Sequence, residues 1–151
     1  MAHRHSVYDT DNHFIVNPIT RLISAQSKKT KLMRYDHNSE RFTFEVPRYI
    51  EGHDMSLCDK ITIEFTNYSQ DGLGLSMGAY SVTDMQISPD GEDVIIFSWL
   101  ISGEATAYSG ELFFGISFLC TVDSLVDYAW HTDSFKEIKV YEGVHNDPNL
   151  F

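Results

Sequence analysis

The stretch that decides the fold is Glu111-Leu112-Phe113-Phe114-Gly115-Ile116-Ser117-Phe118-Leu119-Cys120-Thr121-Val122. Every second side chain in it is apolar or a thiol, from Leu112 through Phe118 to Val122. Because successive side chains of a β-strand point to opposite faces, this period of two predicts a long strand with one face in a hydrophobic core. The opposite face carries Phe113 and Leu119, so we expect it to be partly covered as well.

The same alternation recurs along the rest of the chain. Turn signals rich in Asp, Asn and Gly separate the alternating ranges, and no convincing amphipathic helix is present. The range 94–101 is apolar at nearly every position, which is typical of a central strand buried on both faces. The sequence therefore predicts an all-β fold, an antiparallel β-sandwich of about eight or nine strands that is Ig-like or jelly-roll-like. The other predicted strands are 41–47, 60–66, 79–82, 126–130 and 138–140.

The composition indicates one compact domain. The chain has 151 residues, of which 42% are apolar, and this excludes disorder. We expect a single domain over residues 1–151, with its core at about 7–143 and loose ends at 1–6 and 144–151. The longest unbroken apolar run covers only residues 94–97, far short of the ~20 residues of a membrane span. Residues 1–6 lack the apolar core of a secretory signal, so we expect synthesis in the cytoplasm and no membrane insertion.

Charge is divided unevenly along the chain. The net charge is −11, which argues against a surface that binds nucleic acid. Residues 1–48 carry +3, whereas residues 49–151 carry −14. Two interpretations stay open: the basic part packs on the acidic body of its own chain, which we favour, or it meets the acidic face of another copy or partner. The second interpretation predicts a protein interface made by Arg21, Lys28, Lys29, Lys31, Arg34, Asp90, Glu92 and Asp93.

The two cysteines, Cys58 and Cys120, have a spacing similar to that of the disulfide in immunoglobulin domains. However, Trp99 and Phe118 do not stand where the tryptophan and the corner tyrosine of such a domain would be. Cys120 continues the apolar alternation of its strand, so we expect buried free thiols. Two free thiols and no targeting signal indicate an intracellular site of synthesis.

Two motifs suggest chemistry, and each has a simpler explanation. Gly74-Leu75-Ser76-Met77-Gly78 matches the nucleophile elbow of hydrolases, but the residues after it predict a strand instead of the helix that an elbow needs. Asp9, Asp11 and His13 alternate as metal ligands can, yet the glycine and the distant glutamate of a calcium loop are missing. We interpret them as solvated loop residues. We therefore expect no catalytic residue, no metal and no cofactor, and hence no enzyme.

Aromatic side chains leave one alternative open. The chain has eight tyrosines, ten phenylalanines and two tryptophans. Most of them occupy the alternating positions of the predicted strands that carry apolar side chains, which is typical of a core. Tyrosines that border turns could instead contact a sugar. The alternative function is a carbohydrate-binding module for host cell-surface glycan, with the candidate residues Tyr35, Tyr49, Tyr68 and Tyr108.

Several stretches resemble a family of virion structural proteins. The first is Leu32-Met33-Arg34-Tyr35-Asp36-His37-Asn38-Ser39-Glu40-Arg41-Phe42-Thr43-Phe44-Glu45. It is similar to the N-terminal attachment domains of baseplate-upper or tail-fibre-type proteins in phages and prophages of Gram-positive bacteria. In those domains a strand, an Asp-centred turn and a strand of alternating aromatic residues open a β-sandwich. Further similar stretches lie at 84–90, 98–102 and 126–132, and the similarity covers most of residues 7–143.

The resemblance implies a non-enzymatic part of a virion that docks on a neighbouring virion protein, in the tail, the baseplate or on the capsid surface. A helical stalk or a receptor-binding module commonly follows such domains. No heptads follow here, so we expect attachment or decoration instead of recognition of a host receptor. The expected partners are other virion proteins and further copies of the chain, with a trimer as a natural closed form.

Overall fold

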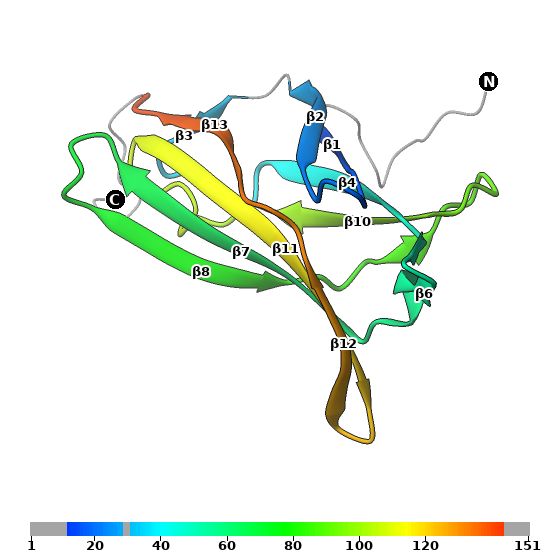
Figure 1. Cartoon of the computed structure of the whole chain (residues 1–151). Helices are drawn as coiled ribbons and strands as arrows, with labels where there is room; N and C mark the ends of the chain where they lie inside the picture. Colours follow the sequence, from blue (N-terminus) through cyan, green and yellow to red (C-terminus); the bar gives the residue numbers. More distant parts are fainter. Residues whose placement is uncertain (1–11, 29–30, 144–151) are drawn as a thin grey trace.

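The computed structural model describes residues 12–28 and 31–143, and their regular structure is almost entirely strand (Figure 1). One 3-10 turn, η2 (Met55–Leu57), is the helical part of these residues. In the same ranges no helix is long and apolar enough to cross a membrane. The predicted all-β class is confirmed. The ends predicted to be loose, 1–6 and 144–151, lie outside the described residues, as do positions 7–11 of the expected core.

Sheet A has the strand order β2-β1-β4-β10-β9. The bounds of β4 are those that the sequence predicts, because its alternation ends at a proline. β10 is buried along most of its length, as the apolar run predicts. The strands of sheet A are β1 (Asn12–Val16), β2 (Ile23–Lys28), β4 (Arg41–Pro47), β9 (Gln86–Ile87) and β10 (Val94–Leu100).

Sheet B has the strand order β3-β13-β11-β7-β8. One half of the long strand β11 pairs with β13, and its other half pairs with β12. A separate ribbon joins β5 (Tyr49–Ile50) to β6 (His53–Asp54). The strands of sheet B are β3 (Leu32–Met33), β7 (Lys60–Ser69), β8 (Leu75–Ser81), β11 (Gly110–Val122), β12 (Leu125–His131) and β13 (Phe135–Tyr141).

Both sheets are mixed, which corrects the prediction of antiparallel sheets. β1 pairs with β4 in parallel, and β3 pairs with β13 in parallel. After β2 the chain leaves sheet A, adds β3 to the edge of sheet B and returns as β4. No hairpin therefore joins β1 to β4, and parallel neighbours need such a crossover. Alternation identifies the buried face of a strand but not its direction.

One hydrophobic cluster joins the two sheets. Phe114 of β11 lies 5.7 Å from Phe14 and 5.3 Å from Trp99 of sheet A, measured between ring centroids. It also lies 5.4 Å from Phe135 of β13. These four side chains are buried. The alternation predicted for β11 is confirmed from Leu112 to Phe118, because Leu112, Phe114, Ile116 and Phe118 are buried, but it is wrong at the end of the strand, where Val122 is exposed.

Candidate functional site

The last residues of β11 and the first residues of β12 form a hairpin that projects from the body of the protein (Figure 1). We call residues 121–127 the arm, and all of them are exposed. Asp123 and Ser124 have φ angles of 52° and 66°, the left-handed conformation of a two-residue type I′ turn that matches the twist of the strands. Three branched apolar side chains stand out from the arm with large exposed fractions: Leu125 (72%), Val126 (59%) and Val122 (58%).

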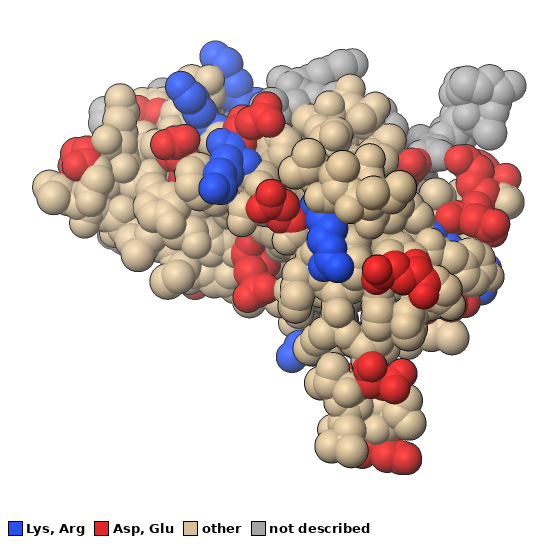
Figure 2. All heavy atoms as spheres, viewed as in Figure 1, with Lys and Arg blue, Asp and Glu red and all other residues tan. Residues whose placement is uncertain are grey.

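The arm combines its three exposed apolar side chains with two exposed acids, Asp123 and Asp127. Figure 2 shows the arm below the body as a mostly uncharged surface that itself carries acidic groups. Single exposed apolar residues need no explanation, whereas neighbouring ones mark a surface that can meet another molecule. Val122 and Leu125 are paired across the hairpin and share one face, and Val126 lies on its other face. The arm is therefore a candidate docking element.

A disulfide between Cys58 and Cys120 ties the root of the arm to the segment that follows η2 (S–S 2.04 Å). The prediction of free thiols is wrong. In an immunoglobulin domain the disulfide joins the facing sides of two sheets, whereas this bond joins β11 to the segment after η2. The absence of the tryptophan and the corner tyrosine of that domain therefore did not exclude a disulfide here. Its formation depends on where the β5–β6 ribbon and η2 pack, which alternation does not specify. Because Cys58 and Cys120 are bonded to each other, they do not indicate an intracellular site of synthesis.

Two further contacts brace the same root. Asp59 accepts hydrogen bonds from the backbone N and from Oγ1 of Thr121, each 2.8 Å long. These bonds hold the pKa of Asp59 below its ordinary value because they favour the charged carboxylate. On the other side of the root, the rings of His53 and Tyr128 stack with centroids 3.7 Å apart. The arm thus leaves the body from a rigid base.

The β5–β6 ribbon that supports the arm is held by an ion pair. Arg48 donates to both carboxylate oxygens of Asp54, at 3.1 and 3.0 Å, and Asp54 also accepts from Ser56 N (3.0 Å) and Oγ (2.6 Å). The hydrogen bonds from Arg48, followed by those from Ser56, lower the pKa of Asp54 from 3.8 to about 2. Since the pKa falls on folding, the carboxylate stabilises the folded protein above about pH 4.

We expect this stabilisation to be lost as the pH falls from about 4 to about 2, the interval between the unfolded and folded pKa values. Asp54→Asn should therefore be less stable than the wild type at neutral pH and should approach it near pH 2. Urea unfolding of both proteins at a series of pH values measures the difference. A difference that stays constant across this interval would contradict the assigned ion pair.

The outer face of sheet B contains a hollow of about 770 Å³. Its lining comes from β7, β8, β11 and the chain around the end of β12. On one side lie Tyr68 and Phe113, whose ring centroids are 5.1 Å apart. Lys136 Nζ lies 5.7 Å from the Phe113 ring centroid. Gly115 stands further along β11, opposite Glu64 in the strand register. The hollow therefore combines aromatic and polar groups around a glycine.

Three polar side chains on this face are linked by hydrogen bonds. Ser117 Oγ donates to Glu64 Oε1 over 2.7 Å, and His131 Nδ1 lies 2.9 Å from Ser117 Oγ. Because the single hydroxyl proton of serine goes to the carboxylate, Nδ1 of His131 is the donor to Oγ. This order differs from that of a hydrolase triad, in which histidine accepts the proton of serine. The arrangement suits binding and does not activate the hydroxyl.

The predicted interface residues are scattered, and several contact their own chain. Arg21 Nη1 donates to the carbonyl of His131 over 3.1 Å, and Lys31 Nζ lies 4.8 Å from the Tyr141 ring centroid. The structure does not describe the side chain of Lys28 or any part of Lys29. Arg34 pairs with its own chain as well, as described below for the 101–109 loop. Asp90, Glu92 and Asp93 are exposed in the turn between β9 and β10.

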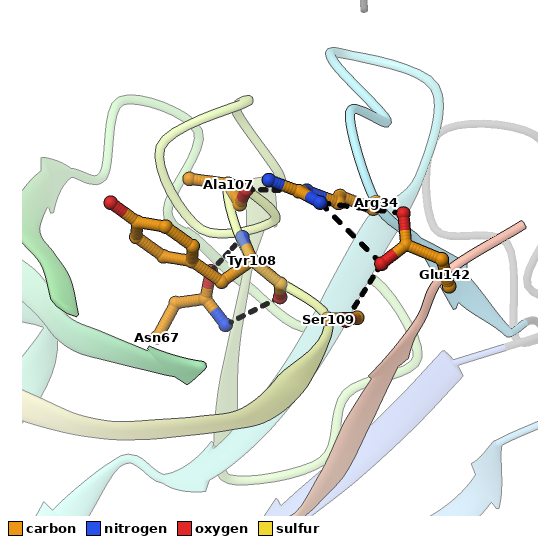
Figure 3. A network of polar contacts seen from close by, with 6 residues as sticks. All are labelled: Arg34, Asn67, Ala107, Tyr108, Ser109 and Glu142. Atoms are coloured by element: carbon orange, nitrogen blue, oxygen red, sulfur yellow. Dashed lines mark hydrogen bonds and ion pairs between the residues drawn. The ribbon is translucent and has the colours of Figure 1, made fainter. Parts of the chain in front are cut away.

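Arg34 belongs to a polar network that fixes the 101–109 loop (Figure 3). Its Nε donates to the carbonyl of Ala107 over 2.9 Å, and its Nη1 lies 3.3 Å from Glu142 Oε2. The fully buried Asn67 accepts from Tyr108 N (2.7 Å) and donates to the carbonyl of Tyr108 (3.1 Å). These groups satisfy one another, so we interpret the network as a structural lock. The contact between Arg34 and Glu142 is of the kind expected if the basic part packs on its own acidic body.

The four tyrosines predicted to contact a glycan lie at three separate places. Tyr35 and Tyr108 flank the guanidinium of Arg34, with ring centroids 4.7 and 5.9 Å away. Tyr49 is half exposed on the β5–β6 ribbon. Tyr68 lines the hollow of sheet B. These four residues do not form one row of aromatic rings.

The two motifs weighed for chemistry lie in strands or outside the described residues. Ser76 is in β8, and its Oγ donates to a backbone carbonyl of the 101–109 loop over 2.6 Å. His13 is buried in β1, 3.7 Å from Glu45, so the prediction of a solvated loop is wrong there. Asp9 and Asp11 are not described. Within residues 12–28 and 31–143, no group of three or more His, Cys, Asp or Glu could hold a metal ion.

Comparison of this chain with models of protein families and with curated proteins finds no match. Function must therefore be inferred from the arm and the hollow. The alternation pattern predicted neither of them as a functional feature. A signal for the arm was present, because Asp123 and Ser124 separate Val122 from the apolar pair Leu125-Val126.

Proposed function

We propose that this protein is a non-enzymatic structural protein of a bacteriophage virion that docks on a neighbouring virion protein through its arm. The observation that carries the proposal is the group of exposed apolar side chains on a hairpin with a rigid root. Such a group loses its contact with water only when a second molecule covers it, which is favourable by roughly 25 cal/mol per Å² of apolar surface. The phage assignment rests on the resemblance of residues 32–45 and the other similar stretches.

The fold proposed for this role is a β-sandwich, Ig-like or jelly-roll-like, in which sheets A and B are the two layers. The ring contacts between Phe14 of sheet A and Phe114 and Phe135 of sheet B support it. A sandwich with a projecting hairpin can join a neighbour without changing its own core. This makes the architecture suitable for an attachment or decoration protein of a tail, a baseplate or a capsid surface.

We further propose that copies of the chain assemble with one another. An arm that inserts into a different surface of the next copy makes a head-to-tail contact, and such contacts must close into a ring or form a filament. A closed ring, with a trimer as its smallest form, is the arrangement proposed here. Since the arm contributes apolar contacts, assembly should persist at high salt, whereas an interface made by rim charges should weaken.

The substitution Leu125→Asp tests this proposal. It places a charge where apolar burial is expected, so the variant should be monomeric under conditions in which the wild type is oligomeric. Because Leu125 is exposed, folding stability should change by no more than about 0.5 kcal/mol. The matched control is Ile19→Asp, at an apolar residue that is 89% exposed in the turn between β1 and β2.

Light scattering coupled to size-exclusion chromatography measures the mass of all three proteins. The proposal expects an oligomer for the wild type and for Ile19→Asp, and a monomer for Leu125→Asp. Equal masses for the wild type and Leu125→Asp would contradict docking between copies through the arm. The proposal that the protein belongs to a virion has a separate test: its gene should lie among genes for tail or capsid proteins.

A further inference from the structure

We infer that the hollow on the outer face of sheet B binds an oligosaccharide. This site goes beyond the proposed docking function and uses none of the arm residues. Of the four tyrosines that the sequence suggested for sugar binding, only Tyr68 lines this hollow. The hollow of about 770 Å³ falls within the range of small-molecule sites, roughly 300–1,000 Å³, and is large enough for a short chain of sugar rings.

The first observation is an aromatic platform outside the core. Tyr68 is 42% exposed, and its ring and that of Phe113 meet at 5.1 Å and 59°. Neither side chain is part of the hydrophobic cluster between the sheets. The faces of aromatic rings carry partial negative charge and attract polarised C–H groups. The apolar side of a pyranose ring presents several C–H groups on one face, so the platform suits a sugar.

The second observation is the pattern of hydrogen-bonding atoms beside the platform. Ser117 uses its proton on Glu64 Oε1 and accepts from Nδ1 of His131. Within the described residues, Oε2 of Glu64 and Nε2 of His131 have no hydrogen-bond partner. Both atoms are acceptors while the carboxylate is charged and the imidazole is neutral. Adjacent acceptors call for a ligand with several donors, and the hydroxyl groups of a saccharide provide them.

The third observation is the glycine at position 115. A Cβ added there would meet its nearest neighbour, Thr132 Oγ1, at 3.6 Å, an ordinary contact, and its φ is not in the left-handed region. Packing therefore does not require glycine at this position. At Gly78, by contrast, a Cβ would come within 2.7 Å of the Phe65 ring. A glycine inside a strand marks a bulge, a bend or a place where a ligand or another backbone approaches closely. Gly115 lies between the residues of β11 that pair with β13 and those that pair with β12, and the open space beside it leaves room for a ligand.

The chemistry favours a saccharide over a protein surface or an anion. A protein partner would have to place an N–H or O–H donor against each of the two acceptors, because an acceptor buried without a donor is costly. An anionic ligand would be repelled by Glu64, and among the described residues the cation in contact with the platform is Lys136. A neutral polyhydroxylated ligand meets neither difficulty.

A glycan array of neutral and acidic oligosaccharides, probed with the full-length protein, tests the inference. The strongest neutral oligosaccharide is then titrated by calorimetry against the wild type and four variants, one of which is the arm variant Leu125→Asp. Tyr68→Ala removes half of the platform, and Gly115→Val fills the hollow with a residue that favours strands. Tyr49→Ala is the control, because Tyr49 is similarly exposed on the distant β5–β6 ribbon.

We expect binding by the wild type and by Tyr49→Ala, and affinity at least about tenfold weaker for Tyr68→Ala and Gly115→Val. Leu125→Asp should bind like the wild type, so that loss of docking and loss of sugar binding are distinguishable. The inference is overturned by an array without signal, by binding restricted to acidic glycans, or by unchanged affinity in both hollow variants. It is also overturned if Tyr68→Ala changes the oligomeric mass and no saccharide binds, since the face then belongs to a protein interface.

Discussion

Phe114→Ala is expected to lower the free energy of unfolding by about 3–5 kcal/mol, the range for removing a fully buried phenylalanine ring. Phe114 is 1% exposed and stands where the two sheets meet. Its ring lies within 6.0 Å of five other aromatic rings, those of Phe14, Phe42, Phe44, Trp99 and Phe135. Rings fixed by contacts from both sheets cannot easily close the cavity, so the cost should fall in the upper part of this range.

Phe113→Ala is the matched control, because Phe113 is the preceding residue on the same strand and faces the hollow. Its ring contacts Tyr68 and Lys136 at the surface, and its loss should cost about 1 kcal/mol. Urea unfolding followed by tryptophan fluorescence measures both variants. Similar losses for the two positions would show that the inward and outward faces of β11 are assigned incorrectly.

Removing the disulfide should have the second-largest effect. Cys58 and Cys120 are 62 residues apart, and a bridge over a loop of that length typically stabilises a protein by about 2–4 kcal/mol. Cys58→Ala combined with Cys120→Ala should be destabilised by this amount in urea. The arm should also become more mobile, because the bond joins its root to the body.

The oxidation state is measured on the same protein. Alkylation of the unfolded wild type without reductant should modify no cysteine, and alkylation after reduction should modify both. If both thiols react without reductant and the double variant is as stable as the wild type, the bridge does not contribute to this fold. The expectation of free thiols from the sequence would then stand.

Alternation predicted most of the fold because it reports directly on burial. The strand bounds at 41–47 agree with β4, and the inward residues Leu112, Phe114 and Ile116 of β11 are buried as expected. Long strands at the centre of a sheet carry many alternating positions, so their pattern is strong. Strands of two residues such as β3, β5 and β6 carry almost none. Their pairing depends on contacts with distant parts of the chain.

The candidate site was less predictable for the same reason. Phe113 and Gly115 lie on the face of β11 opposite the core, where the sequence alternates less clearly. That face forms a hollow only because of its register with β7 and the position of His131. The disulfide and the parallel strand pairs depend on chain crossovers that no local pattern records. Tyr35, Tyr49 and Tyr108 were chosen because they border turns, yet a turn does not determine which surface its tyrosine faces.

Photo-crosslinking from position 125 shows whether the arm docks on a neighbouring protein. A photoreactive phenylalanine analogue placed at position 125, in the full chain, should yield a covalent product of higher mass on a denaturing gel after illumination, because this side chain is buried against a neighbouring protein in the assembly. The same analogue at position 19 should yield none. Equal yields at the two positions, or only unlinked chain from position 125, would contradict a docking role for the arm.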